Sequence, residues 1–250
     1  MRSSILVKDL DIKFRIYHNR APSLKEGFAN LLKPDAVSQY EDFFALKNVS
    51  LSISSGERVG VIGPNGAGKS TFLKALCRIY EPKLGSVIIS GRIAPLLEVG
   101  AGFHPEFTGR ENLYLNGAIL GYSKNELSRM EEEIIAFAEL ENFIDTPVKY
   151  YSTGMYLRLA FSIATAVNPD ILVLDEMFAG GDANFIKKAT DRMSQLINKA
   201  NIMIMVSHQL ELIRNLCNRV IWIEKGMIIA DGSPEKIIMS YLEGVKNRNI

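Results

Sequence analysis

Hydrophobic and polar residues alternate in the first part of the chain. Residues 5–16 alternate imperfectly between apolar and charged side chains, and residues 45–53 form a second such segment before a turn at 54–57. Alternation with period two predicts strands with one buried face. The apolar run at 58–62 then enters a glycine-rich loop, which a helical stretch at 71–79 follows. We expect an antiparallel β subdomain followed by a strand, a loop and a helix.

The middle of the chain changes to helical periodicity. Between about residues 105 and 167, β-branched runs give way to helix-forming stretches such as 124–140 and 156–167. This change predicts a helical subdomain at 105–167. Near the end of the chain, Ser233 and Pro234 have the residue types preferred at the N-cap and first turn of a helix.

The remaining segments predict a parallel sheet. Apolar runs at 171–174 and 202–206 are separated by a helical segment at 185–200. A strand, a helix and a second strand in this order form the repeating unit of parallel sheets. Residues 220–223 and 227–230 flank a short turn and predict a hairpin. The fold class is therefore α/β.

Composition limits the classes of protein that fit this pattern. The 250 residues are 47% hydrophobic and 23% charged, which suits one globular domain over 1–250 with the helical subdomain inserted. Lys and Arg total 29 against 28 Asp and Glu, so the net charge of +1 gives no support for nucleic-acid binding. Cys77 and Cys217 lack the neighbours that a zinc site or a disulfide framework needs.

The sequence also contains no apolar run of the length that a membrane span needs. Apolar Ile5, Leu6 and Val7 are followed at once by charged Lys8 and Asp9, so no secretory signal is expected here. If the protein serves a membrane, we expect a partner to span it.

The glycine-rich loop fits the P-loop pattern, in which a Gly and four further residues precede Gly-Lys-Ser or Gly-Lys-Thr. The loop and the helix start consist of Gly63, Pro64, Asn65, Gly66, Ala67, Gly68, Lys69, Ser70 and Thr71. Small residues let backbone N–H groups surround phosphates, and the helix adds the positive end of its dipole. Lys69 is expected to neutralise the β- and γ-phosphates of ATP, and Ser70 to bind Mg²⁺. The alternative is a chance glycine turn, but the strand before the loop and the helix after it favour a phosphate site.

Two adjacent acids end the apolar run at 171–174. Asp175 is placed to face the magnesium ion from a neighbouring strand end, and Glu176 stands where an attacking water would be. A carboxylate there can orient and polarise that water. The alternative is a strand that simply ends in solvent, where acids are common. With a P-loop upstream, the pair predicts a nucleotide-hydrolysing site.

A further segment, Tyr-Ser-Thr-Gly-Met at 151–155, precedes an amphipathic helix. Alone it indicates an ordinary helix start, with Ser152 or Thr153 as N-cap. In order with the P-loop, Asp175-Glu176, Gly181-Asp182 and Ser207-His208, it resembles the signature of ABC transporter nucleotide-binding subunits, and the resemblance covers nearly the whole chain. The common signature is Leu-Ser-Gly-Gly-Gln, so only Ser152 and Gly154 match it.

The resemblance implies a P-loop NTPase fold with a RecA-like core and roles for several residues. It implies that the signature residues bind the γ-phosphate of an ATP held by a second copy, in a head-to-tail dimer with two ATP molecules. These residues are Ser152, Thr153, Gly154 and Met155. It also implies that Asp182, after the acid pair, belongs to the nucleotide-binding residues and that His208 is the switch histidine, which contacts the γ-phosphate. For a lone His at a strand end, ordinary polar surface remains the alternative.

Two further positions are carried over from the family. Its glutamine loop falls near Glu98, an acid that could reach Mg²⁺ through water. An aromatic ring at the end of the first strand stacks on adenine in the family, and here Phe14 and Tyr17 are the candidates. Packing of these rings in the core is the alternative.

Three segments, at 96–112, 151–155 and 181–185, resemble exporters of lipid-linked polysaccharides such as O antigen, capsule or teichoic acid. The insertion at 17–44 also fits that group. Within it, Leu24, Phe28, Leu31 and Leu32 form one apolar helical face, which lies at the membrane interface in resembling exporters. Packing of that face on the β subdomain is the alternative. Since the sequence stops soon after 235–242, no C-terminal carbohydrate-binding domain is expected.

The resemblance implies a polytopic permease as partner and a location at the cytoplasmic face of the bacterial inner membrane. Contact with the polysaccharide would then be indirect. The competing hypotheses are a cassette for another substrate and a soluble ABC-type ATPase that acts on ribosomes or DNA. Soluble translation factors of that kind usually hold two cassettes, and the DNA-organising relatives contain long coiled coils. Neither feature is present in this sequence.

Overall fold

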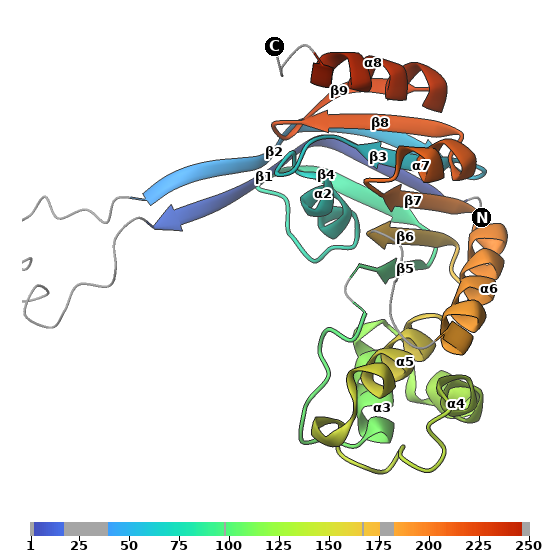
Figure 1. Ribbon diagram of the computed structural model, residues 1–250. Helices are drawn as coiled ribbons and strands as arrows, with labels where there is room; N and C mark the ends of the chain where they lie inside the picture. Colours follow the sequence, from blue (N-terminus) through green and yellow to red (C-terminus); the bar gives the residue numbers. More distant parts are fainter. Residues whose placement is uncertain (1–2, 18–39, 98, 167, 176–182, 247–250) are drawn as a thin grey trace, which may run out of the picture.

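Two sheets and several helices build the molecule. The computed structural model describes residues 3–17, 40–97, 99–166, 168–175 and 183–246. Over these residues the strands form one antiparallel sheet of three strands and one mostly parallel sheet of six. Figure 1 shows the two sheets in one half of the molecule and a group of helices in the other half.

The antiparallel sheet has the strand order β2-β1-β4. It consists of β1 (Ser4–Tyr17), β2 (Tyr40–Ser54) and β4 (Leu84–Ser90). β1 pairs with β2 from Ser4 opposite Ser54 to Tyr17 opposite Tyr40. The outer end of this hairpin extends away from the body (Figure 1), where Lys13 pairs with Asp42 at 2.5 Å and lies over the Phe44 ring.

The second sheet has the order β5-β6-β7-β3-β8-β9. Its strands are β3 (Arg58–Ile62), β5 (Ile93–Leu96), β6 (Ile171–Asp175), β7 (Ile202–Val206), β8 (Arg219–Glu224) and β9 (Met227–Gly232). All neighbours run parallel except β8 and β9. Every residue of β7 is buried, as expected for a parallel strand covered on both faces.

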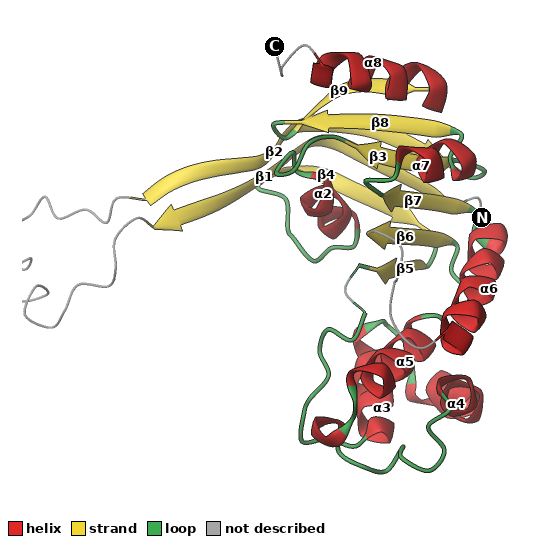
Figure 2. Cartoon of the chain, viewed as in Figure 1, coloured by secondary structure: helices red, strands yellow, loops and turns green. Residues whose placement is uncertain are grey.

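Helices pack on both faces of this sheet, because α2 belongs to one core cluster and α6, α7 and α8 belong to another with the alternate strand residues; Figure 2 shows these helices in red. They are α2 (Lys69–Leu76), α6 (Ala183–Lys199), α7 (Leu210–Leu216) and α8 (Pro234–Lys246). Phe72 and Leu73 of α2 are fully buried in a core shared with both sheets. This packing fixes the N-terminus of α2 at the carboxyl end of β3.

The helical subdomain has its own core. It contains α3 (Gly109–Ile119), α4 (Lys124–Ala138) and α5 (Thr153–Ala164), with a short 3₁₀ turn at Val148–Tyr150. Leu113, Leu127 and Leu159, one from each helix, are buried against one another. α3 and α4 each begin with a capping box, formed by Thr108 with Glu111 in α3 and by Ser123 with Glu126 in α4. The subdomain therefore satisfies its own helix ends.

The predicted fold class is observed, with differences in detail. β3 and β7 have the predicted bounds, and the hairpin of β8 and β9 is where it was expected. β2 begins five residues before the predicted strand, because residues 40–44 continue the ladder beyond the body. β4 and β5 were not predicted.

Candidate nucleotide-binding site

The P-loop lies between β3 and α2. Ile62 ends the buried strand, and Lys69 begins the helix. Gly68 is the N-cap residue of α2 and has φ 105°, which is a left-handed conformation. A glycine cap has no side chain that can bond to the first N–H groups of the helix, and none does so here. This end of α2 therefore has the form of an anion site.

Close packing requires glycine at two positions of the loop. A Cβ on Gly68 would lie 2.5 Å from the carbonyl oxygen of Ala45, and a Cβ on Gly63 would lie 2.0 Å from that of Ile223. Both residues have positive φ, which other residues adopt only with strain. The loop is also hydrogen bonded to the β8–β9 turn, where the Gly226 N–H donates to the Ala67 carbonyl oxygen at 2.9 Å.

Lys69 is buried inside this loop, with 7% of its surface exposed. Its Nζ donates hydrogen bonds to the carbonyl oxygens of Gly63 at 2.9 Å and Pro64 at 3.0 Å. A buried ammonium group is costly unless it is hydrogen bonded. These bonds hold the charge within the loop, where a phosphate group would need it.

A cavity of about 630 Å³ opens beside the loop. Its lining combines loop residues 65–71 with the ends of neighbouring strands, and it includes the predicted polar residues Lys69, Ser70, Asp175 and His208. Asp175 is the last residue of β6, and His208 follows β7. The Ser207 hydroxyl accepts a bond from the Gln209 N–H at 3.0 Å and shapes the turn that carries His208. A cavity of this size suits a small organic ligand.

The donor set beside Lys69 fits a magnesium ion. The Ser70 hydroxyl and the Asp175 carboxylate are hard oxygen ligands, and both line the same cavity. They come from α2 and from β6, which the topology brings to one edge of the sheet. The metal role of these two residues stays a prediction.

Aromatic rings also line the cavity. Phe14 lines it and also contacts Tyr80 edge-on, with ring centroids 5.2 Å apart. Phe43, which the sequence reasoning missed, lies opposite Phe14 in the hairpin ladder, also lines the cavity and is 49% exposed. Its spacing of two from Ala45, another lining residue, was the available signal. Phe43 is thus a further candidate for stacking on a base.

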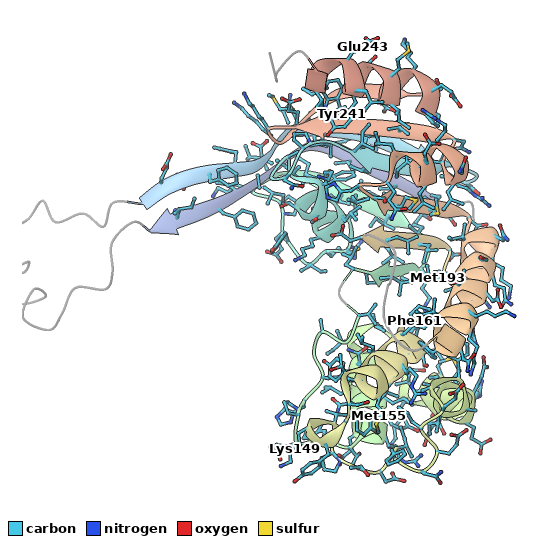
Figure 3. The ribbon with its side chains drawn as sticks, in the orientation of Figure 1. Lys149, Met155, Phe161, Met193, Tyr241 and Glu243 are labelled. Carbon is cyan, nitrogen blue, oxygen red and sulfur yellow. The ribbon has the colours of Figure 1, made fainter. Side chains whose placement is uncertain are left out.

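The signature segment begins α5 in the other half of the molecule. Ser152 is the N-cap, and its hydroxyl accepts a hydrogen bond from the Met155 N–H at 3.2 Å. Burial raises the pKa of Tyr151 to about 12, and its hydroxyl donates to the Phe143 carbonyl oxygen at 2.8 Å. Among the described residues that line the cavity, none belongs to 152–155. Figure 3 labels Met155 in the helical subdomain, far from the P-loop helix of Figure 1.

Several predicted positions cannot be placed. Glu98, Glu176 and Asp182 lie outside the described residues, as do residues 18–39 of the insertion at 17–44. Tyr17 is the last residue of β1, but its side chain is likewise outside the described part. The roles assigned to these positions stay predictions.

Known proteins that are similar in sequence to this chain are ATP-binding proteins, as the P-loop geometry suggests. The family model described as "ABC transporter" matches residues 46–179. The O-antigen export system ATP-binding protein RfbB of Myxococcus xanthus is 46% identical over 80% of this chain, which spans 46% of that relative's length. RfbB of Klebsiella pneumoniae is 38% identical over 93% of this chain and 95% of its own length. The teichoic acids export protein TagH of Listeria monocytogenes is 35% identical over 96% of this chain and 70% of its own.

Solved structures share the fold. The ATP-binding subunit of an ABC transporter aligns over 95% of this chain and 92% of its own, with a TM-score of 0.65 and 24% identity. The cassette MJ0796, in a dimeric post-hydrolysis state bound to ADP and Pi, aligns over 92% of this chain and 98% of its own, with a TM-score of 0.64 and 23% identity. The predicted family and fold class are thereby confirmed. Because the family match covers more than half of the residues, the chain belongs to the ABC transporter family.

Proposed function

We propose that this chain is the ATP-binding and ATP-hydrolysing subunit of an ABC exporter of lipid-linked polysaccharide. The observation that carries the proposal is the cavity where Lys69, Ser70, Asp175 and His208 come together. A cation, a hydroxyl, a carboxylate and an imidazole around one helix N-terminus match what phosphoryl transfer from ATP requires.

The chain's own residues position and neutralise the substrate. The Lys69 ammonium, already oriented by two loop carbonyls, attracts the β- and γ-phosphates of ATP. The N-terminus of α2 adds its dipole, and the His208 imidazole faces the cavity from the end of β7. When bound by Ser70 and Asp175, Mg²⁺ supplies neutralisation of the charge that develops on the phosphates. Glu176, the next residue after Asp175, is proposed to orient and deprotonate the attacking water.

A second copy of the chain is proposed to complete the site. The signature segment lies outside the cavity of its own protomer and exposes a helix N-terminus. A head-to-tail pair would bring this N-terminus to the γ-phosphate held by the partner. The dimeric form of the cassette MJ0796 supports this arrangement.

The proposed cargo and location follow from the relatives. Proteins named as O-antigen and teichoic acid exporters match 80 to 96% of this chain. Within the described residues, no helix has the length and apolar character needed to cross a bilayer. We propose that a polytopic permease provides the path and holds the chain at the cytoplasmic face of the inner membrane.

The decisive experiment is Glu176→Gln. We expect the purified variant to bind ATP normally but to hydrolyse it on the order of 1,000-fold more slowly, because only the proton acceptor is lost. It should accumulate as an ATP-bound dimer in size-exclusion chromatography. Glu211→Gln, an exposed acid paired with Arg214 on α7, is the control. Unchanged hydrolysis in Glu176→Gln would reject this carboxylate as the catalytic base.

The transport role needs a test in cells. If the proposal holds, the chain co-purifies with a polytopic membrane protein, and cells carrying Glu176→Gln retain lipid-linked polysaccharide on the cytoplasmic side. A chain that stays free of membranes, with polysaccharide export intact in the variant, would contradict the exporter assignment but not the ATPase.

A further inference from the structure

Outside the cavity, α6 is fastened to the helical subdomain by a cluster of aromatic and cationic side chains. We call this cluster the α6 clamp; it consists of Phe137, Phe161, Phe185, Lys188 and Arg192. α6 begins at residue 183, directly after the segment 176–182 that contains the proposed catalytic Glu176. Figure 3 labels Phe161 where α5 approaches α6.

Three aromatic rings from three helices form the centre of the clamp. Phe185 of α6 and Phe161 of α5 are each 1% exposed, and their ring centroids are 5.9 Å apart at an interplanar angle of 83°. Phe137 of α4 contacts both, at 5.8 Å from Phe185 and 6.2 Å from Phe161. The two pairs made by Phe185 are edge-to-face, and the Phe137–Phe161 pair is stacked at 25°, so both preferred ring geometries are present. The rings therefore fix the start of α6 against α5, the helix that carries the signature segment at its N-terminus.

Two cationic side chains of α6 make cation–π contacts with the Phe137 ring. The Lys188 Nζ lies 5.1 Å and the Arg192 guanidinium carbon 4.6 Å from the ring centroid. Lys188 also donates to Glu139 at 2.7 Å, and Arg192 donates to Glu133 at 3.0 Å. Each cation thus combines a ring contact with an ion pair, Arg192 to Glu133 within α4 and Lys188 to Glu139, the C-cap of α4. Rotation of the helical subdomain relative to α6 would break all of these contacts together.

The clamp joins two parts of a protomer that serve different ATP molecules. In the proposed dimer, the signature segment contacts the ATP of the partner, whereas the segment before α6 acts on the protomer's own ATP. We propose that the α6 clamp is a positioning element that couples the two ATP sites of the pair. Through it, the nucleotide bound at one site affects ATP hydrolysis at the other. This inference rests on the proposed two-copy function. Its consequence is cooperative ATP hydrolysis by the pair.

The structure supplies a closely matched control. Arg92, between β4 and β5, also connects the core to the helical subdomain: its guanidinium carbon lies 4.5 Å from the Tyr122 ring centroid, and it pairs with Glu126 at 3.2 Å. The ring and carboxylate contacts are equivalent to those of Arg192, but Arg92 does not touch α6. The two arginines differ in exposure, with 39% of the Arg92 side chain and 21% of the Arg192 side chain exposed, and Arg192 also donates to the Thr165 carbonyl oxygen at 3.4 Å.

The test is the ATP concentration dependence of hydrolysis by the purified chain. A Hill coefficient can rise to the number of coupled sites, so we expect a value approaching about two for the unaltered chain and for Arg92→Met. Arg192→Met and Phe137→Leu should bring it to about one, and Arg192→Lys should restore most of it. Thermal unfolding of each variant shows whether the Met variants are equally folded.

The outcomes separate this inference from the proposed function. If the unaltered chain hydrolyses ATP without cooperativity, or if Arg192→Met keeps its Hill coefficient, the clamp does not couple the sites. An equal loss in Arg92→Met would also overturn the inference, since any subdomain contact would then suffice. If the unaltered chain hydrolyses no ATP, the proposed function itself fails.

Discussion

The N-termini of α2 and α5 are both assigned to a nucleotide phosphate, yet they are built differently. α2 is capped by a left-handed glycine without a side-chain bond, and its first residue is a buried lysine that lines a cavity. α5 is capped by Ser152, whose hydroxyl already accepts the Met155 N–H, and the cap is exposed. The N-terminus of α2 therefore leaves its first N–H groups without a side-chain cap, beside a cavity of the same chain. The N-terminus of α5 is capped as in an ordinary helix.

The difference explains how each end contributes to stability. α3 and α4, like α5, satisfy their first N–H groups with their own side chains. Such caps stabilise helices by about 1 kcal/mol each. α2 lacks this contribution and depends on tertiary packing of Phe72 and Leu73. The helical subdomain is thus self-contained, while the P-loop gives up local stability to bind phosphate.

The largest expected effect comes from removing the charge at the α2 end. Lys69→Ala should reduce ATP turnover on the order of 1,000-fold, because Lys69 is the one Lys or Arg among the described residues that line the cavity. Lys74→Ala, on the same helix with its Nζ 5.8 Å from the Tyr80 ring centroid, is the control and should retain turnover. A steady-state ATPase assay decides the matter. Normal turnover in Lys69→Ala would remove the distinction between the two helix ends.

A smaller effect is expected from adding one methyl group at the α5 end. The nearest atom to a Cβ on Gly154 is the Ser152 Oγ at 3.9 Å, so Gly154→Ala fits the folded protomer. Alanine in a helix should raise the free energy of unfolding by about 0.5–1 kcal/mol. We expect ATP turnover to fall on the order of 10-fold nevertheless, because the methyl group blocks the partner's phosphate.

The same substitution at the α2 end should behave differently. Gly68→Ala places a Cβ 2.5 Å from the Ala45 carbonyl oxygen at φ 105°, so stability and turnover should fall together. Urea unfolding and an ATPase assay of both variants separate the cases. If Gly154→Ala is fully active, the signature segment does not approach a phosphate.

The smallest effect concerns the caps themselves and depends on pH. Bonds from the Ser123 backbone and hydroxyl, with Arg92 nearby, lower the pKa of Glu126 from 4.5 to about 2. A lowered folded-state pKa stabilises the fold above pH 4.5, and this contribution is lost as the pH falls towards 2. Glu126→Gln should therefore lower the urea midpoint at pH 7 and bring a smaller change at pH 3. Glu132→Gln, an exposed acid on the same helix, should show no such difference.

Sequence patterns predicted the elements whose signal is local. β3 and β7 are apolar runs bounded by polar residues, and the P-loop carries its own chemistry at fixed spacing. β4 and β5 were missed because β4 is a half-exposed edge strand containing Gly85 and β5 has four residues including Pro95. Both are specified by their sheet neighbours rather than by periodicity.

For the candidate site, too, sequence patterns predicted the residues that belong to local motifs. Lys69, Ser70 and Asp175 follow from motifs, and the structure brings them into one cavity. Phe43 was missed because the predicted strand began at Ala45, so the period-two pattern was not continued to residue 43. The contact of Arg192 with Phe137 joins residues 55 positions apart in the sequence and arises only from tertiary packing.

The long hairpin of β1 and β2 has a consequence for the segment that connects its two strands. Because Tyr17 pairs with Tyr40, the segment between them leaves and re-enters the fold at neighbouring points, about 5 Å apart. A segment joined in this way imposes little strain on its host, whatever its length or composition. We therefore expect that a different segment can join these two strands with little change to the cavity beside the P-loop.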